Sequence, residues 1–143
     1  MVIRWLNNSE LVYSVSSIET LNINTREIKR ITEGSDPKPS LDGQWIAFIY
    51  ENQLWIIDIN ESNSRQLSYI KDGLGDYEFA WAPNSKFIAL KNHPDFHYWE
   101  NTNPPQSKIY IIDIMTGISQ EIASFDASIN YISWLPKTPR GSR

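Results

Sequence analysis

The sequence predicts an all-β fold made of repeated four-stranded units, and two observations support this. First, the chain repeats itself, because residues 21–32, 57–68 and 112–123 align without gaps and each follows a second related segment. Second, the apolar runs are short, rich in Ile, Phe, Trp and Tyr, and bounded by Asn, Asp, Gly, Pro and Ser. Runs of this kind are typical of β-strands.

Apolar residues lie on both faces of the central runs. In residues 55–59, Trp55, Ile57 and Ile59 share one face, and in residues 46–50 both faces are apolar. A sheet with two apolar faces needs a cover on each side, and small sheets stacked about a common axis make a propeller. The predicted fold class is therefore a partial β-propeller of about three four-stranded antiparallel blades.

The repeats divide the chain into blades. We expect one partial propeller over residues 1–136, with blade 1 over about 2–33, blade 2 over about 36–69, blade 3 over about 77–124 and the first strand of a further blade over 129–136. In that last strand Trp134 takes the place of Trp81 and Trp5, and this recurrence indicates core packing. Residues 137–143 offer nothing to bury and are expected to form a flexible tail.

Each unit is expected to supply four strands. In the second unit these cover residues 37–40, 45–50, 54–59 and 64–68, with a tight turn at 51–53. Asp58 and Asp113 each end a third strand before a turn, where we predict that they accept hydrogen bonds from nearby backbone amides.

A family resemblance follows from these segments. WAPNSKFIAL (81–90) and PSLDGQWIAF (39–48) resemble the tryptophan, serine, proline, aspartate, glycine segment of the TolB-type, WD-like propeller repeats. LWIIDI (54–59) resembles the third strand of the same repeats. The second unit departs from the pattern with Pro39 where tryptophan is expected, and the first has Asn22 in place of the third-strand aspartate.

The resemblance implies two kinds of function, because such repeats occur in transport-system components and in prolyl-oligopeptidase-like peptidases. One is a non-catalytic, TolB-like module that binds a protein, a peptide or a saccharide. The other is the gating, substrate-selecting propeller of a peptidase whose catalytic domain is absent from this chain. The sequence has no nucleophile elbow, phosphate-binding glycine loop or zinc-protease helix, so we expect no enzymatic activity from this chain.

One connection in the third unit is enlarged. The spacing from Phe48 to Asp58 is 10 residues, whereas the equivalent spacing from Leu90 to Asp113 is 23. The additional residues lie in the segment HPDFHYWENTNPP (93–105). Loops lengthened on a rigid scaffold often carry binding groups. A spacer without function remains the alternative, since loop closure entropy grows slowly with length.

The long link at residues 69–76 is expected to leave the propeller from the same face as this insertion, and we take that face as the candidate binding surface. Phe96, Tyr98 and Trp99 could offer flat rings to a peptide or a sugar. The same rings could instead fold back over the edge of blade 3.

Two histidines complete the set of candidate ligand-binding residues, His93 and His97. Together with Asp95 they alternate along the chain, so an extended backbone would point all three the same way. Imidazole and carboxylate groups suit Zn, Fe or Mn, which makes these three weak metal candidates. Exposed or loop-packing histidines are the preferred interpretation, and we expect no metal and no cofactor.

Composition excludes several classes of partner. The 13 Lys and Arg against 17 Asp and Glu give a net charge of −4, without a basic stripe, so nucleic acid is not expected. No window is apolar enough for a membrane span, and the first residues lack a secretory signal, so we expect a soluble body. The compartment stays open, and the resemblance suggests the periplasm or cell envelope, or the cytoplasm.

Three blades and a fraction do not close a ring, because propellers typically have four or more. The chain is therefore expected to be a fragment of a longer propeller, to self-associate, or to be an unclosed arc masked by contacts. In the second case two copies would give six blades, and residues 129–136 could donate an innermost strand to a neighbouring molecule.

Overall fold

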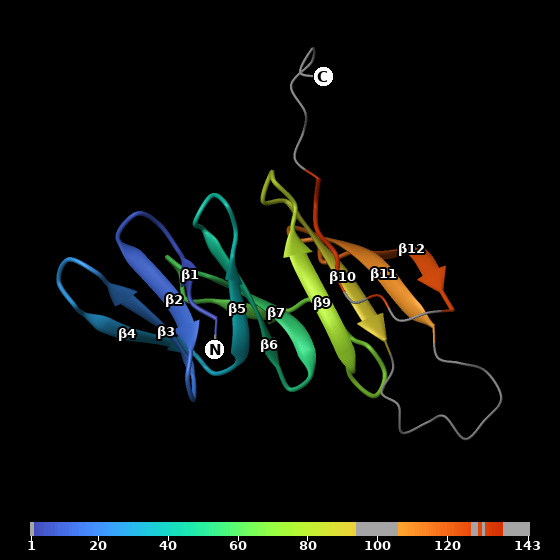
Figure 1. Ribbon diagram of the computed structural model, residues 1–143, viewed down its shortest axis with the longest axis horizontal. Coiled ribbons are helices and arrows are strands. Elements are labelled where there is room, and N and C mark those ends of the chain that lie inside the picture. Colours follow the sequence, from blue (N-terminus) through green and yellow to red (C-terminus); the bar gives the residue numbers. More distant parts are fainter. Residues whose placement is uncertain (1, 94–105, 127–128, 130, 136–143) are drawn as a thin grey trace, which may run out of the picture.

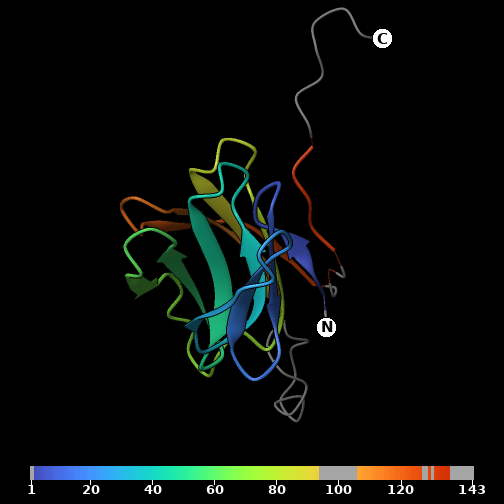
Figure 2. The same cartoon turned by 90° about the vertical axis from the view of Figure 1, so that its left-hand side faces the viewer.

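The computed structural model describes residues 2–93, 106–126, 129 and 131–135. These residues form twelve strands in three separate four-stranded antiparallel sheets, each a meander in sequence order. The sheets stand one beside the next as an arc of blades, with blade 1 and blade 3 at its two ends (Figures 1 and 2). The predicted fold class is thus confirmed.

The strands have the following bounds. Blade 1 contains β1 (Arg4–Trp5), β2 (Glu10–Ser14), β3 (Ile18–Asn22) and β4 (Ile28–Thr32). Blade 2 contains β5 (Ser35–Pro39), β6 (Trp45–Tyr50), β7 (Gln53–Asp58) and β8 (Ser64–Gln66). Blade 3 contains β9 (Asp76–Trp81), β10 (Phe87–His93), β11 (Ser107–Asp113) and β12 (Ser119–Phe125).

The first strands of the blades line one common edge of the arc, which we call the inner edge. Strand β5 lies between β1 and β9 and contacts both. The predicted first strand of a further blade differs from this pattern. Residues 131–135 belong to no strand, because no neighbouring strand among the described residues pairs with them. The expected tail, residues 137–143, lies outside the described residues.

The turns between third and fourth strands are built alike in all three blades. In blade 2 the Asp58 carboxylate accepts hydrogen bonds from the backbone amides two and three residues later, at 2.8 and 3.3 Å. Ser62, with a left-handed φ of 57°, closes the turn by donating to Asp58 O at 2.9 Å. Asn22 and Asp113 make the same pairs of side-chain bonds. The predicted role of the aspartates as turn formers is confirmed.

One backbone hydrogen bond per blade ties the third connection to the first. The three bonds run from Ile23 N to Ser9 O (2.9 Å), from Ile59 N to Gln44 O (3.0 Å) and from Ile114 N to Lys86 O (3.1 Å). First and third connections therefore share one face of the arc, and the second connections lie at the other, as a meander requires.

The hydrophobic cores lie between the blades. We call the face of a blade that is turned toward the preceding blade its leading face, and the opposite one its trailing face. In blade 1 the leading face is the equivalent face, which no described blade covers. Alternate residues of β6 enter different cores: Ile46 and Phe48 pack against blade 1, whereas Ala47 and Ile49 pack against blade 3. All four are nearly inaccessible. Blade 2 therefore buries both its faces, which its two-sided apolar strands predicted.

The turn between the third and fourth strands can be tested for the contribution of its Asp58 side chain to stability. Asp58→Ala removes the acceptor of two backbone amides and should lower the free energy of unfolding by about 1–2 kcal/mol. Asp58→Asn keeps a carbonyl acceptor, as Asn22 does in blade 1, and should cost about 0.5 kcal/mol or less. Urea unfolding of both variants measures this. An equal loss in the two would mean that the carboxylate charge, not its acceptor geometry, holds the turn.

Candidate functional site

Only one of the predicted ligand-binding residues, His93, lies in the described part of the chain. The other candidates fall outside the described residues, namely Asp95, Phe96, His97, Tyr98 and Trp99. The long link that was expected to share their face is described, and it is fastened to blade 2. The Gln53 side chain accepts from Ile70 N at 3.1 Å and donates to Ile70 O at 2.7 Å, and Leu74 is fully buried.

His93 ends β10 within the sheet instead of standing in an exposed loop. It pairs across the strands with Asp76 of β9, and its Nδ1 lies 2.8 Å from Ser107 Oγ at the start of β11. The same hydroxyl accepts a hydrogen bond from Ile129 N at 3.2 Å. His93 is 4% exposed and Ser107 is 0% exposed.

The row Asp76, His93, Ser107 has the residue types of a hydrolase triad, but its geometry does not suit that chemistry. A nucleophile must reach its substrate, and the Ser107 hydroxyl is buried with no exposed surface. The Asp76 carboxylate instead lies 3.0 Å from Nζ of the buried Lys91. Within the described residues no cluster of three or more His, Asp or Glu side chains could hold a metal ion. The row fastens Ile129 to the end of blade 3.

A cleft of about 630 Å³ runs along the inner edge and was not predicted. Its lining comes from the first strands of all three blades and from the chain after blade 3: Val2, Arg4, Trp5, Asp36, Lys38, Pro39, Glu78, Phe79, Ala80, Trp81, Tyr131, Ile132 and Ser133. The cleft is the one place in the described chain where charged and aromatic side chains from every blade come together.

A repeated signal in the sequence marks this cleft. Arg4 and Lys38 each stand one residue before the tryptophan position of their unit, and Asp36 and Glu78 each stand three residues before it. Residues two apart on a strand point to the same side. All four side chains line the cleft, although β5 is irregular between Ser35 and Lys38 and Asp36 has a positive φ of 51°, so regular alternation alone does not place Asp36. The pattern is visible only once the first strands are aligned by their tryptophan position.

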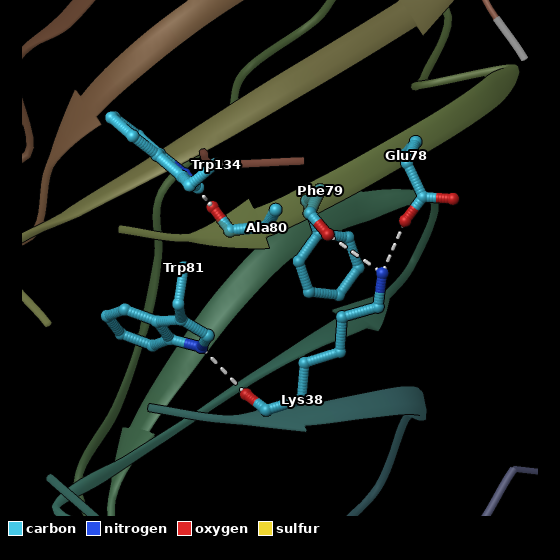
Figure 3. Close-up of polar contacts among 6 residues, drawn as sticks. All are labelled: Lys38, Glu78, Phe79, Ala80, Trp81 and Trp134. Carbon is cyan, nitrogen blue, oxygen red and sulfur yellow. Dashed lines mark hydrogen bonds and ion pairs between the residues drawn. The ribbon is translucent and has the colours of Figure 1, made fainter. Parts of the chain in front are cut away.

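Lys38 lines the cleft and joins blades 2 and 3 (Figure 3). Its Nζ lies 2.5 Å from Glu78 Oε1, donates to Phe79 O at 2.8 Å, and stands 4.2 Å from the centre of the Phe79 ring. Both charged side chains are largely buried, with 15% and 27% exposure. Because the ammonium is also bound to a backbone carbonyl and a ring face, it holds the two inner strands in register.

Tyr77 packs against the core between blades 2 and 3 and stacks on Phe79, with ring centroids 6.1 Å apart. Burial raises the pKa of the Tyr77 phenol to about 12, and the nearby Asp36 carboxylate raises this pKa further. The backbone of Asp36 has a positive φ of 51°. An ionised phenolate is disfavoured there because it would lose water and face a negative charge.

Two indoles make equivalent contacts along the inner edge (Figure 3). Trp81 Nε1 donates to Lys38 O at 2.8 Å, and Trp134 Nε1 donates to Ala80 O at 3.0 Å. Lys38 and Ala80 occupy the same place in their units, one residue before the tryptophan position. Each of these two indoles thus donates to the same carbonyl of the preceding unit. Trp5, at the same position of the first unit, is 60% exposed, so the core packing that the recurrence predicted is not found there.

Comparison with known proteins identifies the fold. No family model matches the chain, and no curated protein does. An oligogalacturonate lyase from Vibrio parahaemolyticus matches with a TM-score of 0.68 at 14% identity, over 85% of this chain and 38% of that chain. An acylaminoacyl peptidase from Pyrococcus horikoshii matches with a TM-score of 0.65 at 17% identity, over 87% of this chain and 24% of that chain.

A TolB-type protein from Agrobacterium tumefaciens also matches, with a TM-score of 0.56 at 15% identity, over 80% of this chain and 44% of that chain. At such identities the likeness shows the fold alone: three antiparallel sheets similar to the blades of β-propeller domains. The chain spans less than half the length of each of these structures. No helix in the described residues is long and apolar enough to cross a membrane.

The Tyr77 environment predicts a loss of stability at high pH. Because the folded-state pKa lies above the ordinary value of 10.0, the stabilisation is complete below pH 10 and is lost as the pH rises from 10 through 12. The difference in unfolding free energy between the natural protein and Tyr77→Phe should change across this window, as measured by urea unfolding. Tyr131→Phe, which changes an exposed tyrosine, is the control: its unfolding free energy should differ from that of the natural protein by the same amount throughout this pH window. A difference that stays constant would contradict the assignment.

Proposed function

We propose that this chain is a non-catalytic, TolB-like propeller module that binds an extended peptide segment in the cleft along its inner edge. The observation that carries the proposal is the composition of that cleft. Two cations, two anions and exposed aromatic rings line about 630 Å³ of open space. Rings that present an apolar body with a polar tip are favoured in recognition sites.

The balance of charge favours a peptide over an acidic saccharide. Lys38 is already neutralised by Glu78, and Asp36 offsets Arg4, so the cleft has no excess of positive charge for a polyanion. The whole chain has a net charge of −4. A peptide, by contrast, offers alternating donors and acceptors and side chains of either sign. The similar structures include an acylaminoacyl peptidase, a dipeptidyl peptidase and the tricorn protease, and also an oligogalacturonate lyase.

The gating propeller of a peptidase is the second candidate. It is favoured by the match to acylaminoacyl peptidase, of which this chain covers 24%. In that case the same cleft would select peptides for a catalytic domain encoded elsewhere. The two candidates share the ligand class and differ in what accompanies the propeller. A hydrolase sequence next to this one in the full reading frame would decide for the second.

Peptide binding is tested by fluorescence anisotropy with a library of labelled short peptides, and an oligogalacturonate is the comparison ligand. Tyr131→Ala removes a ring that is 73% exposed in the cleft and should weaken binding about tenfold. Tyr69→Ala removes a ring that is 77% exposed outside the cleft, and it should leave binding unchanged. Binding of the saccharide alone, or equal effects of the two variants, would refute the proposal.

A further variant distinguishes the cleft from the insertion. Replacing residues 94–105 by a short Gly and Asn turn keeps β10 and β11 joined while removing the predicted aromatic set. We expect peptide affinity to be retained, because the cleft residues lie on other segments. Loss of affinity with an intact fold would place the binding groups on the insertion instead.

A further inference from the structure

The two ends of the arc carry copies of the same inter-blade faces that the interior buries. One cross-strand pair recurs on the leading face of every blade: Leu11 with Leu21, Ile46 with Ile57, and Ile88 with Ile112. The members in blades 2 and 3 are at most 2% exposed. Leu11 and Leu21 are only half-buried, because no described blade precedes blade 1.

The trailing face of blade 3 shows the same relation. Ala89 and Ile111 stand at the places of Ala47 and Ile56 in blade 2. The two blade 2 residues are fully buried by blade 3, whereas Ala89 and Ile111 are half-buried. The arc therefore ends in two apolar faces, each of which is half of the interface found between its own blades.

The two end faces are unlike, so they suit a head-to-tail contact and not a contact between two like faces. Lys91, on the trailing face of blade 3, stands at the place of the buried Ile49 of blade 2. It is 1% exposed and its Nζ is paired with Asp76 at 3.0 Å, so it adds no free charge to that face. The complementarity is therefore that of the leading and trailing faces that pack together inside the arc.

The chain after blade 3 already occupies the innermost position of a following blade. Ile129 N is bound to Ser107 Oγ, and Trp134 is bound to Ala80 O, the carbonyl that the tryptophan of the next inner strand uses. Within the described residues nothing pairs with its outer edge. At the other end, β1 has only two residues and pairs with β2 through Arg4 with Val12 and Trp5 with Leu11.

We infer that the leading face of blade 1 is the docking surface for a second copy of this chain. Residues 131–135 of one molecule pair with β2 of the other and replace its short β1, so that Ser133 and Trp134 take the places of Arg4 and Trp5 beside β2 and at that end of the cleft. The trailing face of blade 3 then covers Leu11 and Leu21 of the partner. Repeating the contact reciprocally closes two copies into a ring of six blades, within the usual range for propellers.

Light scattering with size-exclusion chromatography tests the association. At about 100 µM the natural chain should elute with twice the mass of 16.6 kDa. Leu11→Asp puts a charge into the half-buried pair of Leu11 and Leu21 that the partner would cover, and it should give a folded single chain. Ile28→Asp makes a comparable apolar-to-acidic change on the outer strand β4, at a side chain that is 59% exposed, and it should leave the dimer intact. A folded monomer of the natural chain at this concentration overturns the inference. The leading face of blade 1 would then have to be covered by something other than a second copy of this chain.

Cross-linking tests the proposed strand exchange, and the chain contains no cysteine of its own. Extending the β1–β2 register places Ile132 of one molecule opposite Tyr13 of the other. An oxidised mixture of the single variants Ile132→Cys and Tyr13→Cys should form a disulfide-linked heterodimer. A mixture of Ile132→Cys and Asn24→Cys should not, because residue 24 lies in a turn at the opposite face. Equal cross-linking in both mixtures, or none in either, overturns the exchange.

Discussion

The structure depends on one constraint: a small sheet with two apolar faces is stable only when both faces are covered. Blade 2 meets this constraint completely. Successive residues of β6 enter separate cores, and Ile56 and Ile57 of β7 do the same. A sheet of this kind has no independent core, so the blades stabilise one another and the central blade supports both of its neighbours.

Polar contacts at the inner edge set the register of this packing. Apolar faces alone could slide past each other, because the hydrophobic effect has no direction. The indole of Trp81 on the carbonyl of Lys38, and the ammonium of Lys38 on blade 3, fix the height of one inner strand against the next. Pro39 removes the equivalent indole between blades 1 and 2. Another polar contact between these two blades, from Ser14 Oγ to Gly34 O at 3.3 Å, lies at the other end of β5.

The parts of the structure that the sequence predicted are local or repeated. Strand positions followed from apolar alternation, and the turn at Asp58 followed from its side-chain chemistry, so both needed only near neighbours. The cleft could not be predicted in this way, because Lys38 and Glu78 are 40 residues apart and meet only through blade packing. The burial of His93 also depends on a distant residue, Ser107. The hydrogen bond between Gln53 and Ile70 likewise fixes the long link at residues 69–76 to blade 2, and the sequence did not predict it.

Native-state hydrogen exchange, at concentrations dilute enough for single chains, tests the central constraint most directly. Strands β6 and β7, covered on both faces, should exchange their amides only through global unfolding. Strands β2 and β3, with an open leading face, should exchange through smaller openings and therefore faster. Equal protection of β2, β3, β6 and β7 would show that a blade is stable with one face uncovered, and would contradict the account.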